Sequence, residues 1–425
     1  MVAQEDWRQW RGPTADGVAA NSNPATSWSE EENIKWKIAV PGRGGSTPIV
    51  LKDRIYVLTA INTGRVDPSF PKPEDQPDRV FGIKFPNTFY QFVVLCYDRN
   101  SGKEVWRQVV LEKVPHEGHH RDNDFAPASP TTDGERIFFT FASAGTYCFS
   151  PDGKLLWQRD LGNLRMQASL GEGCSPVVHN GKLILQRDQQ RQSSIMVLDA
   201  ASGSTIWEKP RPDTGSWATP RVIEHGGKTQ IIASGSMGNE KDSSVNRVRS
   251  YDLESGELLW ECGGLTSNAI PCPVNDSNSV YVMTGYQGFS ALSIPLDSEG
   301  DVTGSPTWQF TEDTPYIPSP LLYGGLLYFN RSNQAIFSCI DSSNGERVFG
   351  PTRLPQMNQI YASPVAANGR VYVTGRNGTT VVLKAGRSFE VESINVLDDR
   401  VDASLAIAGD EIFIRGEKYL YCIAP

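Results

Sequence analysis

Two short signatures alternate along the 425-residue chain, and their phase constrains the fold more than any other feature. The first is a small residue followed by proline at the start of a short apolar strand. Its copies are STPIV (46–50), ASPTT (128–132), CSPVV (174–178), ATPRV (218–222), PCPVN (271–275), PSPLL (318–322), ASPVA (362–366) and, without the proline, ASLAI (403–407). Successive prolines lie 82, 46, 44, 53, 47 and 44 residues apart, and Leu405 follows after 41. Apart from one insertion these are the lengths of four-stranded propeller blades, so eight copies predict eight blades.

The second signature is D-x-x-x-G-x-x-x-W, a turn that leads into a strand carrying tryptophan. It reads Asp98-Gly102-Trp106, Asp199-Gly203-Trp207 and Asp252-Gly256-Trp260, and Asp341-Gly345-Phe349 keeps the spacing with Phe for Trp. A shortened form ends at Trp157 and a lengthened one at Trp308. Asp and Gly supply the turn, and one large flat ring in each unit predicts packing in the seam between neighbouring sheets.

Alternating segments such as RIYVLT (54–59), SVYVMT (279–284) and RVYVTG (370–375) lie between the signatures and have strand composition. No segment has sustained helical periodicity. The last unit stops before its fourth strand, whereas NIKWKIAVPG (33–42) precedes the first unit and resembles that missing strand. We therefore expect an all-β, eight-bladed β-propeller of four-stranded antiparallel blades, closed by an N-terminal strand that completes the last blade.

The predicted domain organisation is an N-terminal extension (1–32) packed on a single propeller (33–425), with an insertion (62–92) in the first blade. No apolar run is long enough to cross a bilayer. The formal net charge of −9 and the scattered basic residues argue against a nucleic-acid partner. We expect a monomer.

The seven cysteines include no C-x-x-C pair, which excludes the usual zinc, thioredoxin and haem-attachment motifs. Cys96, Cys148, Cys339 and Cys422 occupy one repeat position in apolar strands, so we expect buried, unpaired thiols. Cys262 and Cys272 are ten residues apart and leave a disulfide open as an alternative.

The N-terminus MVAQEDWRQWRGP lacks the apolar core of a signal peptide. Either the chain is cytosolic or a signal has been removed. Val2-Ala3-Gln4 is similar to the small-residue end of a cleavage site, so we favour removal and a periplasmic or otherwise exported location.

The two coupled signatures resemble the tryptophan-docked repeats of the quinoprotein-like propellers, from about Trp28 to Pro425. That group includes alcohol and glucose dehydrogenases that use pyrroloquinoline quinone (PQQ), and a propeller lipoprotein of the outer-membrane assembly machinery that has no cofactor. The opening WRQWRGP also resembles exported bacterial members to which no activity is assigned. The resemblance implies the fold and does not fix a chemistry.

The resemblance also frames the enzymatic alternative. PQQ dehydrogenases have a vicinal disulfide against the quinone, a calcium ion held by oxygen ligands and a catalytic Asp. This sequence has no adjacent cysteines and mostly short loops, and it lacks G-x-S-x-G, H-E-x-x-H and phosphate-loop motifs. We therefore name no catalytic residue and expect no cofactor, with PQQ plus calcium or another divalent metal as the alternative.

Two irregular segments are expected on the same face of the propeller, since B-to-C and D-to-A connections emerge together. One is the insertion (62–92), and the other is the His-rich loop (112–126), which holds three of the five histidines. Candidate metal ligands in this loop are His116, His119, His120, Asp122 and Asp124. A solvated polar loop explains the same residues, and binding of an anionic or polar ligand by the histidines is a third interpretation.

Arginines recur at the ends of B strands, where they are expected near the mouth of the channel on this face: Arg187, Arg331, Arg376 and Arg415. Converging arginines suit a carboxylate, a phosphate-like group or an acidic peptide, whereas pairing with neighbouring acids is the structural alternative. The aromatic residues Trp217, Tyr316 and Tyr361 precede A strands and are candidates for lining the same mouth.

The preferred functional hypothesis is a non-catalytic binding or scaffold propeller that recognises a protein partner or a small polar ligand on this face. The alternative is a PQQ- or metal-dependent oxidoreductase with its site at the same mouth.

Overall fold

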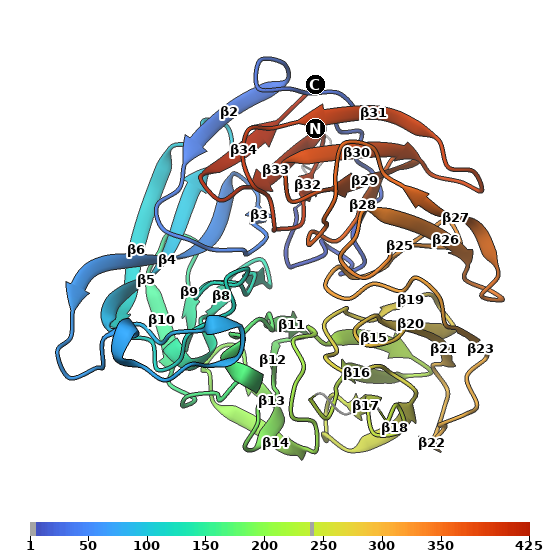
Figure 1. Ribbon diagram of the computed structural model, residues 1–425, viewed down its shortest axis with the longest axis horizontal. Coiled ribbons are helices and arrows are strands. Elements are labelled where there is room, and N and C mark those ends of the chain that lie inside the picture. Colours follow the sequence, from blue (N-terminus) through green and yellow to red (C-terminus); the bar gives the residue numbers. More distant parts are fainter. Residues whose placement is uncertain (1–5, 239–241) are drawn as a thin grey trace.

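The computed structural model describes residues 6–238 and 242–425 and contains eight sheets arranged around one axis (Figure 1). Each blade has four strands that follow one another outwards from the axis, and the strand that begins with the small-residue–Pro signature is innermost. The predicted eight-bladed β-propeller is confirmed. Val2-Ala3-Gln4, on which the signal-removal hypothesis depends, lies outside the described residues.

The first four blades have the following strands. Blade 1 contains β3 (Ile49–Leu51), β4 (Arg54–Val66), β5 (Thr88–Asp98) and β6 (Glu104–Lys113). Blade 2 contains β7 (Thr131–Thr132), β8 (Ile137–Thr140), β9 (Thr146–Phe149) and β10 (Leu155–Arg159). Blade 3 contains β11 (Val177–His179), β12 (Lys182–Arg187), β13 (Ser193–Asp199) and β14 (Thr205–Arg211). Blade 4 contains β15 (Arg221–His225), β16 (Lys228–Ser234), β17 (Arg247–Asp252) and β18 (Leu258–Gly263), on which β22 (Gly300–Asp301) pairs in parallel.

The other four blades complete the ring. Blade 5 contains β19 (Val274–Asn275), β20 (Ser279–Thr284), β21 (Ser290–Pro295) and β23 (Trp308–Phe310). Blade 6 contains β24 (Leu321–Tyr323), β25 (Leu326–Asn330), β26 (Ile336–Asp341) and β27 (Arg347–Arg353). Blade 7 contains β28 (Val365–Ala367), β29 (Arg370–Thr374), β30 (Thr379–Lys384) and β31 (Val391–Val396), with β1 (Val18–Ala19) parallel to β28. Blade 8 contains β32 (Ala406–Ala408), β33 (Glu411–Arg415), β34 (Tyr419–Ile423) and β2 (Ile34–Ala39). Four 3-10 turns are at Pro73–Asp75, Val80–Gly82, Ala142–Ala144 and Gln167–Ser169.

At five seams of the described structure, a tryptophan of one blade joins it to the next through two contacts. The Trp157 indole donates through Nε1 to the carbonyl of Ala200 in the following blade (3.0 Å). The same ring lies over Gly203, where a Cβ atom would come within 2.7 Å of it and the backbone φ is +70°. Only glycine suits both conditions. The Gly of each D-x-x-x-G turn therefore receives the ring of the blade before it, which explains why the two residue types recur together.

The seam between blades 4 and 5 uses a different device, because the turn of blade 5 lacks this glycine. Trp260 donates through Nε1 to Oε1 of Gln230 in its own blade (3.0 Å). The amide of Gln230 in turn donates to the carbonyl of Leu296 in blade 5 (2.8 Å). A buried glutamine thus links the indole to the neighbouring sheet.

The residues before the signature prolines, together with Ser404 in the copy that lacks proline, form a hydrogen-bonded ring around the axis, called the ring of hydroxyls below although one member is Cys272. Side chains of the ring accept hydrogen bonds from the equivalent backbone N–H groups of the preceding blades. The donor–acceptor pairs are Thr47–Ser129, Ser129–Ser175, Ser175–Thr219, Thr219–Cys272, Cys272–Ser319, Ser319–Ser363 and Ser363–Ser404, at 2.8–3.0 Å. Small polar residues are needed here because successive A strands approach each other at the axis.

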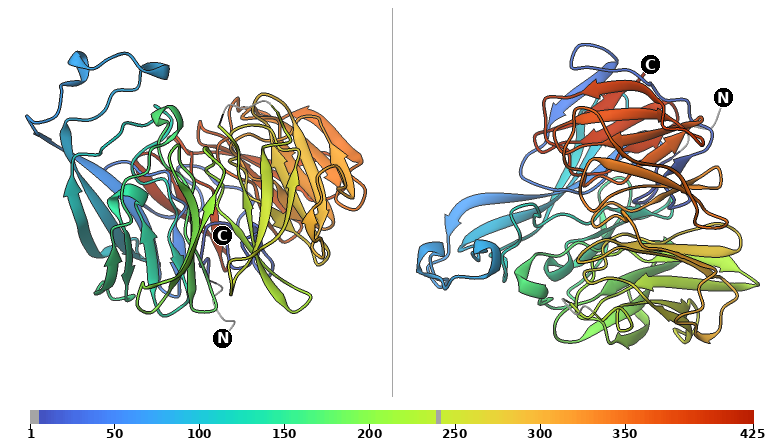
Figure 2. Two further views of the ribbon diagram at one scale, coloured as in Figure 1. Left: turned by 90° about the horizontal axis from the view of Figure 1, so that it is seen from below. Right: turned by 45° about the vertical axis from the view of Figure 1, so that its right-hand side comes forward.

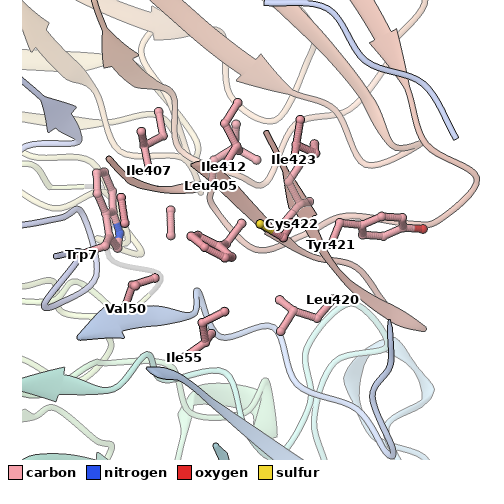
Figure 3. Close-up of a cluster of buried hydrophobic side chains, with 14 of the residues drawn as sticks. Trp7, Val50, Ile55, Leu405, Ile407, Ile412, Leu420, Tyr421, Cys422 and Ile423 are labelled. Atoms are coloured by element: carbon pink, nitrogen blue, oxygen red, sulfur yellow. The ribbon is translucent and has the colours of Figure 1, made fainter. Parts of the chain in front are cut away.

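The ring is closed by pairing of β2 with β34, in which Trp36 lies opposite Cys422, as expected. The seam with blade 1 is apolar, and Figure 3 shows Leu420 of blade 8 on the side of Val50 and Ile55 of blade 1, whereas Ile407 and Ile412 point to the other side of blade 8. The pairing of β2 with β34 thus places blades 8 and 1 in one continuous hydrophobic core.

The N-terminal segment crosses the channel and blocks one end of it. Trp7 is fully buried and pairs with Val50 through two backbone hydrogen bonds of 2.9 Å. Arg11 donates to the carbonyls of Pro364 (2.7 Å) and Pro320 (2.9 Å), directly beside the ring of hydroxyls. Burial lowers the pKa of Arg11 to about 10. The channel is consequently open on one face only.

The opposite face carries the insertion. Strands β4 and β5 extend beyond their blade and the intervening residues fold into an arm, defined here as residues 62–92. Figure 2 shows the arm rising from one face of the propeller. The face that carries the arm is called the arm face below.

All seven cysteines are free thiols. Cys96, Cys148, Cys339 and Cys422 are buried in the third strands of their blades, as expected, and Cys272 belongs to the ring at the axis. Within the described ranges no helix is long and apolar enough to cross a membrane.

Candidate functional site

A pocket of about 470 Å³ occupies the channel on the arm face. It will be called the central pocket. Its lining comes from the D-to-A connections of all eight blades, from Thr47 in blade 1 to Ser404 in blade 8, and from the arm. Volumes of roughly 300–1,000 Å³ are typical of small-molecule sites, and a site that many rigid strands support is preorganised.

The floor of the central pocket is the ring of hydroxyls together with the N-terminal segment. Six of the lining residues carry hydroxyls of the ring motif: Thr47, Ser129, Ser175, Thr219, Ser363 and Ser404. Trp10 lines the same pocket and the small cavity on the other side of the ring. The N-terminal segment therefore makes the channel a pocket with one mouth.

Aromatic side chains form the wall. Trp217 is fixed by donation from Nε1 to the carbonyl of Gly171 (2.7 Å). The rings of Tyr286 and Tyr316 stack with centroids 4.8 Å apart and planes 26° apart. Tyr361 lies under the guanidinium of Arg376, 3.7 Å from its ring centroid, and donates to Asp122 (3.1 Å). These flat faces are held in place before any ligand arrives.

One side of the mouth is closed by an ion network that joins the His-rich loop to blades 7 and 8. Asp122 accepts from Arg376 (2.9 Å) and Arg400 (3.1 Å). Asp402 accepts from the same two arginines, at 2.7 Å and 2.8 Å. Burial raises the pKa of Asp402 to about 6, although Arg376 opposes that shift. Each carboxylate at the mouth is thus already neutralised by arginine.

Two further polar groups line the pocket away from this network. Glu172 is partly buried, accepts from the backbone N–H and the hydroxyl of Ser143, and has its pKa raised by burial. Asn268 is 3% exposed, hydrogen-bonds to Tyr316, and presents an Oδ1 atom that has no hydrogen-bond partner among the described residues. Neither residue stands out in the sequence, because irregular loops have no period that marks a position.

The arm reaches the mouth of the pocket through Val80 and Phe81. These side chains are 57% and 68% exposed, and the Phe81 ring lies edge-on to His120 with centroids 5.4 Å apart. Phe81 also has a φ of +58°, an uncommon conformation for a bulky residue. The arm thus holds an apolar tip over the pocket and in contact with the His-rich loop.

The aromatic candidates and the arginine candidates have different positions. Trp217, Tyr316 and Tyr361 all line the central pocket, whereas none of the four arginines does. Arg187 donates to the carbonyls of Leu161 and Gly162, and Arg415 is 1% exposed and donates to Gly416. Arg331 lies 3.5 Å from Asp313, and Arg376 supports the wall from behind. Each of the four arginines has a contact within the protein, although Nε and Nη2 of Arg415 have no hydrogen-bond partner among the described residues, and none of the four lines the central pocket.

The metal-ligand candidates do not come together either. His116 donates to the carbonyl of Leu164 (2.6 Å), and His119 donates to that of His120 (2.7 Å). Asp124 is partly buried, which raises its pKa, and it accepts from the backbone N–H of Ala126. In residues 6–238 and 242–425, no three His, Cys, Asp or Glu side chains are grouped as a metal ion requires.

The central pocket does not fit PQQ. This quinone is a polycarboxylate, and burying its charges requires cationic or metal partners. The lining contains Asp122, Glu172 and Asp402 but no Lys or Arg. The seven free cysteines provide no vicinal disulfide to pack against a quinone ring.

Comparison with known proteins gives a matching family model, a protein of similar sequence and solved structures of similar fold. The family model described as "Outer membrane protein assembly factor BamB" matches residues 91–349. The protein of that name from Yersinia pestis is 25% identical over 236 residues, which cover 50% of this chain and 56% of the relative, so the match spans little more than half of the relative's length.

Solved structures share the fold at low identity. BamB from Moraxella catarrhalis superposes with a TM-score of 0.52 at 12% identity, covering 87% of this chain and all of that one. A europium-containing methanol dehydrogenase gives 0.62 at 8% identity, covering 99% and 98%. The quinohemoprotein alcohol dehydrogenase ADHIIG from Pseudomonas putida HK5 gives 0.60 at 10% identity, covering 99% and 80%. At these identities the similarity shows the fold alone.

Proposed function

Because the chain belongs to the family of the outer membrane protein assembly factor BamB, we propose that it is a non-catalytic binding or scaffold propeller. It recognises a protein partner or a small ligand on the arm face, and it acts as a monomer in the periplasm or another exported location. The observation that carries the proposal is the coincidence of three features on one face: the single mouth of the channel, the His-rich loop and the apolar tip of the arm.

The arm supports the recognition of a protein. Among the described residues, four of the exposed large apolar side chains belong to the arm, namely Val66, Phe70, Val80 and Phe81. Clustered apolar groups with a polar surround are typical of interaction sites, and loops on a rigid scaffold suit that role. The positive φ of Phe81 adds support, because strained residues tend to persist where function requires them.

Site-specific photo-crosslinking tests this proposal. A photo-reactive amino acid replaces Phe81 in one sample and Leu155 in another, and both are irradiated in an extract of the source cells. Leu155 is the control, since it is 44% exposed on the outer strand β10. We expect a discrete protein adduct from position 81 that Leu155 does not give, and loss of that adduct in a Val80→Ser background. Identical adducts from both positions, or none from position 81, would contradict the proposal.

The quinoprotein dehydrogenases that share the fold favour an oxidoreductase as the second candidate. In this chain the lining of the central pocket lacks the cations that a polycarboxylate quinone needs. The residues thus give the oxidoreductase less support than the binding function.

A further inference from the structure

We propose that the central pocket binds a small, uncharged, polyhydroxylated ligand, that is, a saccharide of one or two rings. The inference deepens the proposed function by naming the class of small ligand, and it shares with that proposal only the choice of face. Its basis is the chemistry of the lining, beginning with charge.

The lining disfavours both anionic and cationic ligands. No Lys or Arg lines the pocket, so a buried anion would lack a partner. The carboxylates of Asp122 and Asp402 are each already paired with two arginines, and burial raises the pKa of Glu172, which favours its neutral form. An organic cation would therefore find aromatic rings but no uncompensated negative charge. The pocket suits a neutral ligand.

The floor suits a ligand that is rich in hydroxyl groups. Five ring hydroxyls of the pocket lining accept a backbone N–H from the preceding blade, and this leaves the proton of each hydroxyl available to donate: Ser129, Ser175, Thr219, Ser363 and Ser404. Different blades therefore supply several hydroxyl donors to the floor of the pocket. Sugar hydroxyls both accept and donate, so they can bind such protons and also the carboxylate oxygens at the mouth.

The wall suits the apolar faces of a sugar ring. Trp217 and the stacked pair Tyr286 and Tyr316 present flat surfaces that hydrogen bonds and ring packing hold still. A ligand that packs on such rings loses its own freedom but requires little ordering of the protein. Aromatic surface with a few convergent polar groups is the usual composition of a small-molecule site.

The side chain of Asn268 independently indicates that the pocket binds a polar ligand. Its Oδ1 is buried without a partner among the described residues, and such an orphan costs about 1–3 kcal/mol. Ala168 in the same lining has a φ of +48°, which is a strained conformation for alanine. Unsatisfied groups and strained backbone are retained mainly at functional positions. A ligand hydroxyl donated to this amide would remove the penalty.

The test is isothermal calorimetry supported by saturation-transfer NMR on the full chain. The neutral probes are glucose, mannose, N-acetylglucosamine, maltose and cellobiose, and the charged probes are glucuronate and glucosamine. We expect at least one neutral sugar to bind with a dissociation constant of about 1 mM or tighter. Its charged counterpart should bind at least roughly tenfold more weakly, which corresponds to about 1.4 kcal/mol.

Variants locate the binding. Trp217→Ala should weaken the neutral sugar at least about tenfold, and Trp217→Leu, which keeps apolar volume without the flat ring, should do the same. Tyr323→Ala, at the end of β24 and outside the pocket lining, is the matched control and should leave affinity unchanged. Circular dichroism of each variant checks the fold.

Two sources of the sugar are distinguished by chain length. Tighter binding of longer oligosaccharides with the same dependence on Trp217 would identify the end of a glycan chain, whereas equal binding would identify a free sugar, and either result supports the inference. Absence of binding to every neutral probe, preference for glucuronate or glucosamine, or full affinity in both Trp217 variants would overturn it. Because these measurements use no protein partner, their failure is separate from failure of the crosslinking test.

Discussion

Substitution of one seam glycine should separate backbone strain from ring packing in this fold. Gly203 has a φ of +70°, and an added Cβ would lie 2.7 Å from the indole of Trp157. Placing alanine in the left-handed region costs about 1–2 kcal/mol, and overpacking typically adds about 1–3 kcal/mol. Gly203→Ala should therefore lower the free energy of unfolding by about 2–5 kcal/mol.

Gly324 provides the matched control for this substitution. Its φ is +60° and no atom lies within 4 Å of the position of a Cβ, so Gly324→Ala should carry only the strain of about 1–2 kcal/mol. Urea-induced unfolding at 25 °C, followed by tryptophan fluorescence and circular dichroism, measures both variants. Equal destabilisation would refute the docking argument.

A double-mutant cycle gives a second check on the same contact. Trp157→Leu removes the ring that the new methyl group would strike, at the cost of the hydrogen bond from Nε1 to Ala200. In that background Gly203→Ala should cost about 1–3 kcal/mol less than in the native chain. Strictly additive effects would show that the glycine and the ring do not interact.

Two further predictions concern buried charge. The side chain of Arg211 is fully buried between Asp188 and Asp213, at 2.8 Å from each, so Arg211→Met should lower the free energy of unfolding in urea by about 3–5 kcal/mol. Arg370→Met breaks a more exposed pair with Glu392 and should lower it by about 1 kcal/mol or less. Similar losses in the two variants would contradict the account. Asp402 has a folded-state pKa of about 6, above its ordinary 3.8, so its ionisation lowers the free energy of unfolding as the pH rises through that interval. As the pH rises from about 4 to about 7.5, the free energy of unfolding of Asp402→Asn should therefore increase by about 1–3 kcal/mol relative to that of the native protein. A pH-independent difference in unfolding free energy between the two proteins would exclude this titration.

The architecture could be predicted because one physical requirement is repeated in phase. Five seams use a tryptophan ring and a glycine that receives it, so pairs such as Trp157 and Gly203 are visible as a pattern. The exception was not predictable, since Gln230 replaces the glycine contact from a different strand of the blade. The hydroxyl ring was visible only as the small residue before proline, and its hydrogen bonds run between blades that are about one repeat apart in sequence.

The sequence predicted the positions of some candidate residues better than others, for reasons that differ between residue types. Trp217, Tyr316 and Tyr361 line the pocket because the A strands begin at the axis, and their place in the repeat fixes this. Long arginine side chains have no such constraint, so Arg415 turns to a backbone carbonyl in its own loop. The contribution of Trp10 depends on the path of the N-terminal segment, which no repeat encodes.

The most direct test of the central claim, that this propeller binds without catalysing, is reconstitution with PQQ and calcium. After desalting, quinone absorbance and dye reduction are measured with alcohols and sugars as substrates. Our account predicts that no stoichiometric quinone is retained and that no turnover occurs, because the lining has no cation to hold its carboxylates. Retained quinone with turnover would contradict it.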